Sequence, residues 1–424
     1  MIKFLFKGIL RDRNRSMLPV IVVIIGVFLT VMLNCWITGI MGDIVDMNAN
    51  FTTGHVKIMT RAYARNAEMI SNDLALMGVS ELIDHLNKKY PSMEWVERIR
   101  FGGLIDIAGK NGETRAQGPA AGQAFDLLSP GSEEVERMNI KKSIVAGRIP
   151  VKQGEILISN DFAVRFGVGP GDEVTLFSST MYGSMAFKNF RIAGTVRFGV
   201  ALLDKGAILI DISDARQVLD MEDAAGEILG YSRGNTYNNE EAAIIASSFN
   251  KEYASDKNDF APRMVTLRDQ NNLASYIDFI DKISGIMVAV FVLAMSIVLW
   301  NTGLLGGLRR YNEFGLRLAM GEEKNHIYKT LIYESVLIGL AGSVIGTALG
   351  LWASLTLQKH GLDFSSVFKN SSMMTPAVFR AVVTPAAFYI GFIPGLFSMM
   401  VGNALSGIGI YKRKTAQLFK ELEV

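Results

Sequence analysis

Long apolar runs without charge dominate the pattern of this chain. Four windows contain no Asp, Glu, Lys or Arg, and they cover residues 16–42, 283–308, 335–358 and 381–411. Each window holds at least 24 residues, and a helix of that length crosses the roughly 30 Å hydrocarbon core of a bilayer at about 1.5 Å per residue. Each window therefore predicts a membrane-spanning helix.

The stretch between the first two windows has the pattern of an α+β domain. Alternating apolar and polar residues over 95–108, and short apolar runs at 155–158 and 207–211, predict strands. Ser159 is expected to cap a helix that ends at Phe166. Further strands are expected at 54–59, in the stretch that ends at residue 177, and at 190–198. A hairpin turn is expected at 109–112. Helices are expected to begin at Ser80 and at Ser213, and to cover 239–250 and 270–282. The last helix should run straight into the second span, and a division into two lobes is expected near 120–145.

The composition reflects this mixture of two kinds of sequence. Hydrophobic residues make up 49% of the chain and charged residues 20%, but all charges lie outside the four windows, where their density is that of a soluble protein. A disordered chain, a collagen and a soluble enzyme are thereby excluded. The single cysteine, Cys35, lies in the first window, so the domain has no disulfide and needs a packed apolar core.

The distribution of basic residues predicts the orientation in the membrane. The N-terminal tail, the loop after the second window and the C-terminal tail are rich in Lys and Arg, which favour the cytoplasmic side. The α+β stretch is then external: residues 43–282 hold 26 Lys/Arg against 33 Asp/Glu, whereas the rest holds 17 against 8. The near-neutral total of +2 therefore combines two opposed charges on opposite sides of a membrane.

These features predict one span, a large external domain and then three spans. The first span follows basic residues but is too long for a cleaved signal peptide, so we interpret it as an anchor. The expected order is a cytoplasmic amphipathic segment (1–16), a first span (17–42), the external α+β domain (43–282), a second span (283–308), a cytoplasmic loop (309–329), a third span (330–358), a short external loop (359–380), a fourth span (381–411) and a cytoplasmic tail (412–424).

Glycines at helical spacing mark the spans. Small residues allow close approach of helices in lipid, either within one bundle or between subunits, and both interpretations stay open. Prolines in the fourth span are expected to kink it. The glycines are Gly303, Gly307, Gly342, Gly346, Gly350, Gly391 and Gly395, and the prolines are Pro385 and Pro394.

Motifs of catalysis are missing from the sequence. It contains no G-x-x-x-x-G-K-[ST], G-x-S-x-G or H-E-x-x-H. Its four histidines are far apart, so no metal-ligand cluster is predicted, and His55 is interpreted as a structural residue. Only Glu334 lies close to a span, where it is expected to pair with Lys329 or reach solvent, which argues against a proton-driven carrier or an ion channel. No catalytic or metal-binding residue is predicted.

The segment after the second span, LRRYNEFGLRLAMG at 308–321, predicts a short amphipathic helix along the membrane face. Glu313 and Arg317 are expected to form an i, i+4 pair, and Gly321 to end the helix. Its expected apolar surface consists of Phe314, Leu316, Leu318 and Met320.

The pattern E-F-G-x-R-x-A-M-G, followed by a glycine-rich span with Glu334 at its entrance, resembles the FtsX/MacB-type permeases of ABC transporters. Motifs at 54–58, 146–148, 154–158 and 168–172 resemble the MacB-like periplasmic domain, and the one-plus-three order of spans fits the family. The tail at 413–424 departs from it, since it lacks the proline of many members. The resemblance implies a coupling helix that docks on a cytoplasmic ATPase, with Glu313, Phe314, Gly315, Arg317, Ala319, Met320 and Gly321 as its residues.

The resemblance further implies a permease subunit without enzymatic activity, in the bacterial inner membrane. ATP and Mg would be bound by separate ABC ATPase subunits, and a second permease subunit would complete the pair. A separate ATPase and a large external domain look most like the lipoprotein-releasing permeases, with membrane lipid, lipoproteins and a periplasmic carrier as further partners and no nucleic acid. Movement of the coupling helix would pass through the spans and the stalk-like segments 43–50 and 270–282 to the external domain.

Two other functions remain open within the resemblance. One is MacB-like efflux of amphiphiles or peptides with an adaptor and an outer-membrane channel. The other is FtsX-like regulation of a cell-wall hydrolase. A membrane-tethered enzyme is disfavoured because the catalytic motifs are missing.

Overall fold

The computed structural model describes residues 13–66, 69–109, 113–233, 237–256, 258–270, 273–308, 310–363 and 378–412. The chain forms two compact units: a helical unit of Met1–Asp43, Phe279–Leu362 and Phe379–Val424, and a domain unit of Ile44–Asp278 and Asp363–Val378. Most of the expected amphipathic segment 1–16, the hairpin turn at 109–112, the short loop 359–380 and the tail 412–424 lie outside the described residues.

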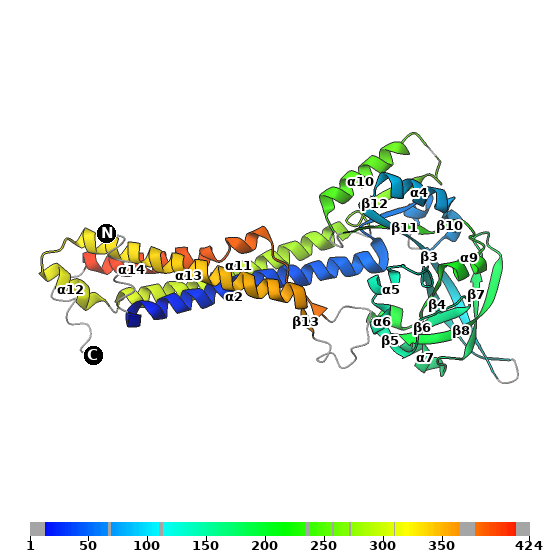
Figure 1. The fold of residues 1–424 in the computed structure, drawn as a ribbon, viewed down its shortest axis with the longest axis horizontal. Coiled ribbons are helices and arrows are strands. Elements are labelled where there is room, and N and C mark those ends of the chain that lie inside the picture. The colour runs from blue at the N-terminus through cyan, green and yellow to red at the C-terminus, as the bar shows by residue number, and fades with distance from the viewer. Residues whose placement is uncertain are drawn as a thin grey trace. The chain divides into compact units, whose positions relative to one another are not determined.

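The helical unit is built from long apolar helices that lie side by side (Figure 1). The stretches long and apolar enough to cross a membrane in the described part of the chain number four: Met17–Thr53, Leu273–Ala319, Lys324–His360 and Pro385–Ile408. The prediction of four apolar helices is thereby confirmed. The elements are α2 (Arg13–Asn48), α11 (Leu273–Leu308), α12 (Tyr311–Ala319), α13 (Lys324–His360), η3 (Pro385–Phe388), η4 (Ile393–Ser398) and α14 (Met399–Lys412).

The fourth apolar stretch is irregular at the predicted prolines. Pro385 begins the 3₁₀ turn η3, and Pro394 lies in the first turn of the π-helix η4. Proline has no N–H for the helix ladder and its ring displaces the preceding turn. The predicted span 381–411 is therefore a regular α-helix only from Met399 onward.

The domain unit mixes strands and short helices. Its strands are β1 (Val56–Thr60), β2 (Leu76–Met77), β3 (Met93–Ala108), β4 (Thr114–Phe125), β5 (Ile144–Gly147), β6 (Glu155–Ser159), β7 (Glu173–Ser179), β8 (Met185–Val196), β9 (Ala207–Asp211), β10 (Ala224–Ala225), β11 (Glu227–Ser232) and β12 (Pro262–Thr266). Its helices are η1 (Ala49–Thr53), α3 (Arg61–Arg65), η2 (Asn72–Leu74), α4 (Val79–Lys89), α5 (Glu134–Arg137), α6 (Ile140–Ser143), α7 (Asn160–Phe166), α8 (Ala201–Asp204), α9 (Ile212–Leu219) and α10 (Asn239–Glu252). The short strands β13 (Leu362–Asp363) and β14 (Val378–Phe379) pair with each other.

Strand β3 is shared by two parts of one ten-stranded sheet. Its first residues, Met93–Arg98, pair with β11, which continues through β1 to β12. Its later residues belong to a closed ring of strands in the order β3–β4–β9–β6–β8–β7 and back to β3. Helices α4 and α10 lie near the first part and α7 near the ring (Figure 1). The division between the two parts therefore falls within β3 instead of near residues 120–145.

Apolar residues on both faces of the central strands explain their uninterrupted hydrophobic sequences. Ile156 and Ile158 of β6 point into the main core, whereas Leu157 between them points into a second core formed with α5 and α6. On β9, Ile208 and Ile210 belong to the main core and Leu209 belongs to the second core. Side chains alternate along a strand, so a strand that is covered on both faces carries no polar position.

Local signals for helix starts were only partly correct. Ser159 caps α7, since its hydroxyl accepts the Phe162 N–H at 3.2 Å, as predicted. Ser80 does not cap α4: the helix begins at Val79 after Gly78 in a left-handed conformation, and the Ser80 hydroxyl donates to Asp223 at 2.7 Å instead. Helix α11 runs without interruption from Leu273 to Leu308, which fits the prediction for 270–282.

A set of buried charged groups contacts η1, the segment that directly follows the first long helix α2. Arg98 and Glu134 are only 3% and 1% exposed, and the Arg98 Nη2 lies 2.8 Å from the Glu134 Oε2. Arg98 also donates to the Phe51 carbonyl at 3.0 Å, and the Tyr231 hydroxyl donates to the Ala49 carbonyl at 3.2 Å. Both carbonyls belong to η1; the Ala49 carbonyl also accepts the Gly54 N–H at 2.8 Å, and carbonyls near a helix end commonly lack partners inside the helix.

Arg137 completes this set, which we call the Arg98 cluster (Arg98, Glu134, Arg137, Glu94 and Tyr231). Its guanidinium pairs with Glu134 and lies 2.6 Å from the Glu94 Oε2. It also stacks on the Tyr231 ring at 4.1 Å. Each buried charge in the cluster thus has an opposite charge and hydrogen bonds, without which its burial would be strongly unfavourable.

Loss of the Arg98 guanidinium should destabilise the domain. Arg98→Met removes the donor to the Phe51 carbonyl of η1 and one of the two guanidinium partners of Glu134, and we expect the free energy of unfolding to fall by about 3–5 kcal/mol. Arg65→Met is the matched control, because the Arg65–Asp259 pair is exposed and should contribute less than about 1 kcal/mol. Chemical unfolding of the purified full chain measures both, and equal effects would contradict the role assigned to the cluster.

The neighbouring His55 is a buried structural histidine. Its Nδ1 accepts the Ser232 N–H at 3.0 Å, and its ring centroid lies 5.6 Å from that of Tyr231. Burial, and secondarily the charge of Arg137, lower the pKa of His55 from 6.5 to about 4. No group of residues able to hold a metal ion occurs in the described ranges.

The lowered pKa of His55 predicts acid sensitivity. Between pH 6.5 and about 4 the unfolded chain binds a proton at this position and the folded chain does not, so stability is full above this window and is lost as the pH falls through it. The loss should reach about 3 kcal/mol. His55→Asn keeps an acceptor for Ser232 without titrating, and its unfolding midpoint should fall less steeply with pH than that of the wild type; parallel pH profiles would contradict the prediction.

Candidate functional site on helix α12

Helix α12 occupies the position of the predicted amphipathic segment. It runs over Tyr311–Ala319, between α11 and α13. Gly321 follows with a φ of +92°, a left-handed conformation that favours glycine. The turn at Gly321 ends the helix, as the sequence predicts, and leads into α13.

One face of α12 is anchored in the helical unit. Tyr311 and Phe314 form a buried cluster with Ile327 and Leu331 of α13 and Ile410 of α14. The Tyr311 hydroxyl also donates to the Ser406 carbonyl at 2.7 Å. Gly315 is buried on the same face. These contacts attach α12 to both α13 and α14.

The opposite face of α12 is exposed and partly apolar. Asn312, Leu316, Ala319 and Met320 are exposed, and their spacing places them on one side of a helix. Leu316 is 54% and Met320 73% exposed. The expected apolar surface is therefore divided, because Phe314 lies in the anchor and Leu318 packs against it.

The ion pairs around α12 differ from the expected ones. Arg317 donates from Nε to the Glu322 Oε2 at 2.6 Å and does not pair with Glu313. The turn at Gly321 brings Glu322 back to Arg317, and a two-point contact between guanidinium and carboxylate is stronger than an exposed i, i+4 pair. Glu313 instead pairs with Arg310, and its Oε2 lies 3.2 Å from the Arg310 Nε.

Glu334 also has a different partner from the one predicted. Its Oε2 lies 2.6 Å from the Arg310 Nη1, so Arg310, and not Lys329, neutralises it. Arg310 thereby joins the start of α12 to α13, and its guanidinium lies 5.8 Å from the Phe314 ring centre. Arg310, Tyr311 and Glu322 were missed as site residues, since their partners are distant in sequence or approach only through the turn at Gly321.

The seven glycines singled out in the spans lie at contacts between helices of one chain. A methyl group on Gly346 would come within 2.7 Å of the Ile24 carbonyl oxygen of α2. Close approach of this kind is what small residues allow in lipid. Gly342, Gly346 and Gly350 of α13 face Val23, Val27 and Val31 of α2; Gly303 and Gly307 of α11 face Asn403 and Ser406 of α14; and Gly391 and Gly395 face Val27. These contacts correspond to packing within one bundle.

These features together define a class of protein. Long apolar helices, an α+β domain inserted after the first of them, and a short two-faced helix between two others characterise a multi-span membrane protein with a large inserted domain. No group of residues able to hold a metal ion accompanies them in the described ranges.

Sequence comparison then identifies the family. The family described as FtsX-like permease C-terminal matches residues 285–415, and the MacB-like periplasmic core domain matches residues 16–244, more than half of the chain. The chain belongs to the FtsX/MacB-type ABC transporter permeases. The prediction of a MacB-like α+β domain is thereby confirmed.

Curated relatives match over a short part of their length. The chain is 30% identical over 109 residues to the macrolide export ATP-binding/permease protein MacB 2 of Yersinia pestis bv. Antiqua (strain Antiqua), covering 26% of this chain and 16% of that protein. MacB of Wolinella succinogenes is 26% identical over 132 residues, covering 30% and 18%. The matches thus span less than a fifth of these relatives. The solved periplasmic region of MacB from Actinobacillus actinomycetemcomitans aligns with a TM-score of 0.36 and 10% identity, over 54% of this chain and 95% of that chain.

Proposed function

We propose that the chain is the permease subunit of an ABC transporter and is driven by a separate ATPase that docks on the exposed face of α12. The observation that carries the proposal is the division of α12 into two faces. One face is fixed to α13 and α14 through Tyr311 and Phe314, and the other presents Leu316 and Met320 to solvent. Exposed apolar side chains on a short anchored helix suit a protein partner. ATP and Mg would be bound by that partner.

The anchor explains how force on α12 would be transmitted. Pressure on Leu316 and Met320 would move Tyr311 and Phe314 against α13 and α14, because packed side chains shift together. Arg310 adds an ionic connection to Glu334 on α13. Helices α2 and α11 both continue into the domain unit, where the Arg98 cluster holds the end of the first helix. In this proposal ATP-driven closure of the ATPases is converted into movement of the external domain.

The proposal includes an orientation of the chain in the membrane and a second permease subunit. The basic residues of the 309–329 loop support an orientation in which α12 would lie in the cytoplasm, residues 43–282 in the periplasm and the spans in the inner membrane. Helix α11 leaves Ile286, Val290, Leu293 and Ile297 exposed at helical spacing. Lipid and a second permease subunit, identical or not, would cover this face.

A charge on the outer face of α12 should uncouple the ATPase. In the reconstituted permease–ATPase complex, Leu316→Asp combined with Met320→Asp should lower stimulated ATP hydrolysis about tenfold, since burying an unpaired carboxylate disfavours docking. Leu202→Asp is the matched control, an exposed leucine of the external domain, and should leave hydrolysis unchanged. Normal stimulation by the α12 variant, with normal membrane insertion, would refute docking at this face.

For the cargo we propose lipid-modified proteins, released from the outer leaflet of the inner membrane. Support comes from the scarcity of charged residues in the four predicted spans, where Glu334 at the start of the third is the only one; this suits a cargo handled beside the bundle instead of one that passes along a polar pathway. A second candidate, MacB-like efflux with an adaptor, is favoured by the relatives, whose names concern macrolide export.

Depletion of the protein distinguishes the two cargo classes. If it releases lipoproteins, their share in the inner-membrane fraction should rise on depletion, as measured by fractionation and immunoblotting, while sensitivity to macrolides stays unchanged. Normal arrival of lipoproteins at the outer membrane together with increased macrolide sensitivity would reject lipoprotein release and favour efflux. The double variant of α12 should reproduce the effect of depletion.

A further inference from the structure

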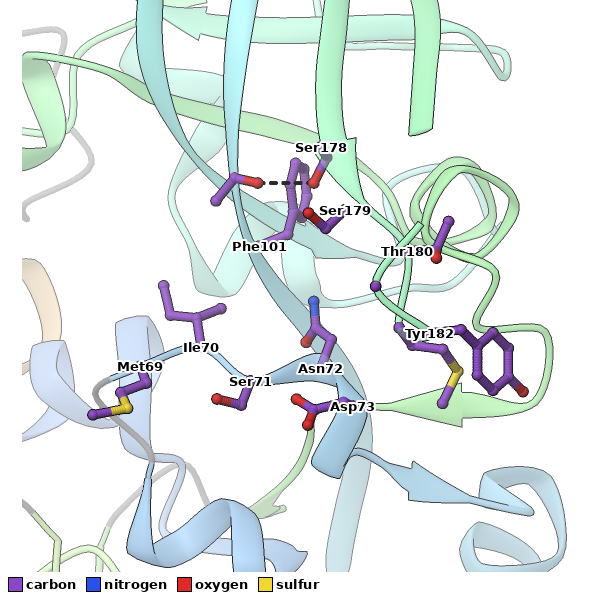
Figure 2. A pocket seen from close by; sticks show the side chains of 13 residues that line it. Met69, Ile70, Ser71, Asn72, Asp73, Phe101, Ser178, Ser179, Thr180 and Tyr182 are labelled. Atoms are coloured by element: carbon purple, nitrogen blue, oxygen red, sulfur yellow. Dashed lines mark hydrogen bonds between the residues drawn. The ribbon is translucent and has the colours of Figure 1, made fainter. Parts of the chain in front are cut away.

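The domain unit contains a cavity where the two parts of the sheet separate. Pairing of β3 with β11 ends at Arg98, and pairing of β3 with β7 begins at Gly103. A cavity of about 720 Å³ lies at this fork, lined by Phe101 and Gly102 of β3, the segment 69–73 and the β7–β8 turn at 178–183 (Figure 2). We call it the fork pocket. Its volume lies in the range of sites for small organic ligands.

The lining of the fork pocket is rich in hydrogen-bond acceptors and contains no basic residue. Asp73 is its carboxylate, and hydroxyl and amide groups supply most of the other polar atoms. A site of this composition disfavours phosphates, sulfates and carboxylates and favours a neutral or cationic donor group. The remaining polar side chains are Ser71, Asn72, Ser178, Ser179 and Thr180.

Two features indicate that the segment 69–73 is held for binding. Ile70 has a φ of +53°, which is unfavourable for a β-branched residue, and such strain is concentrated at functional sites. The Asn72 side-chain oxygen is buried and accepts no hydrogen bond from any described residue. A buried acceptor without a partner is unfavourable, so this segment is held in a conformation that its own hydrogen bonds do not account for.

Apolar groups line the pocket beside these acceptors. Met69 and Tyr182 are among the most exposed large side chains of the domain, Tyr182 at 70%. Figure 2 shows the 69–73 segment on one side and Tyr182 with the β7–β8 turn on the other. Methionine side chains adapt to irregular apolar ligands, and an exposed tyrosine ring attracts cations.

We propose that the fork pocket binds a small cationic amphiphile, with its amine or ammonium group near Asp73 and Asn72 and its apolar body against Met69, Met181 and Tyr182. This site lies on the external domain and is independent of the docking at α12. It gives the domain a direct way to recognise a ligand, and the chemistry of that ligand follows from the lining. An anionic amphiphile of the same length should not bind.

Gly102 offers a way to fill the pocket without disturbing the fold. The first carbon of a side chain at Gly102 would have no neighbour within 4 Å, and its backbone is in an ordinary conformation. Gly102→Leu should therefore occupy the cavity, whereas the same change at Gly103 would collide with the Phe177 carbonyl. Gly169→Leu is a matched control, since Gly169 is equally unobstructed and lies outside the pocket.

The test uses the full chain in lipid nanodiscs and isothermal titration with octyltrimethylammonium, octyl sulfate and octyl glucoside. Partition into lipid is measured with empty nanodiscs and subtracted. Wild type and Gly169→Leu should show one saturable site for the cation, and Gly102→Leu and Asp73→Asn should weaken it about tenfold or more. Unchanged unfolding midpoints of the variants would show that the loss is local.

Three results would overturn the proposal. Equal binding of octyl sulfate would remove the charge preference, and tighter binding of octyl glucoside would assign the pocket to a neutral polyol. Saturable binding of the cation that persists unchanged in Gly102→Leu and Asp73→Asn would place the site elsewhere on the protein. None of these results depends on ATP hydrolysis, so they leave the proposed coupling at α12 untouched.

Discussion

The burial of the Arg98 guanidinium is the constraint on which the domain unit depends. A guanidinium that is 3% exposed requires an opposite charge and partners for its N–H groups. Glu134 supplies the first, and the Phe51 backbone carbonyl at the end of the first long apolar stretch is one of the second. The bond to Phe51 gives a partner to a carbonyl at a helix end, where carbonyls commonly lack one within the helix. One buried cation thereby fixes where the helix ends and which part of β3 it meets.

The helical unit is held by a different kind of interaction. Apolar surfaces gain little from association in lipid, so close contact between backbones and side chains must stabilise the bundle. Valines of α2 meet glycines of α13 for this reason. Helix α12 is attached by an aromatic anchor, Tyr311 and Phe314, and by Arg310. These contacts all lie on one side of α12 and leave its outer face exposed, which a docking surface requires.

The shared strand β3 connects the fold of the domain to its chemistry. A strand of 16 residues is long enough to belong to both parts of the sheet in succession, pairing first with β11 and then with β4 and β7. Where the partners change, neighbouring strands separate and side chains of the loops fill only part of the gap. The fork pocket is the result, and its acceptor-rich lining comes from segments more than a hundred residues apart.

The sequence by itself determined the four apolar helices, the α+β character of the domain, the extent of β9, the cap at Ser159 and the position of α12, because these follow from length, local periodicity and nearby polar groups. Only the tertiary structure decided the partners of the charges. Arg317 pairs with Glu322 and not with Glu313, and Glu334 pairs with Arg310, since electrostatic contacts depend on turns and helix crossings that no local pattern encodes. The same reason explains why Phe314 is an anchor, why β3 divides the domain, and why distant segments meet at the fork pocket.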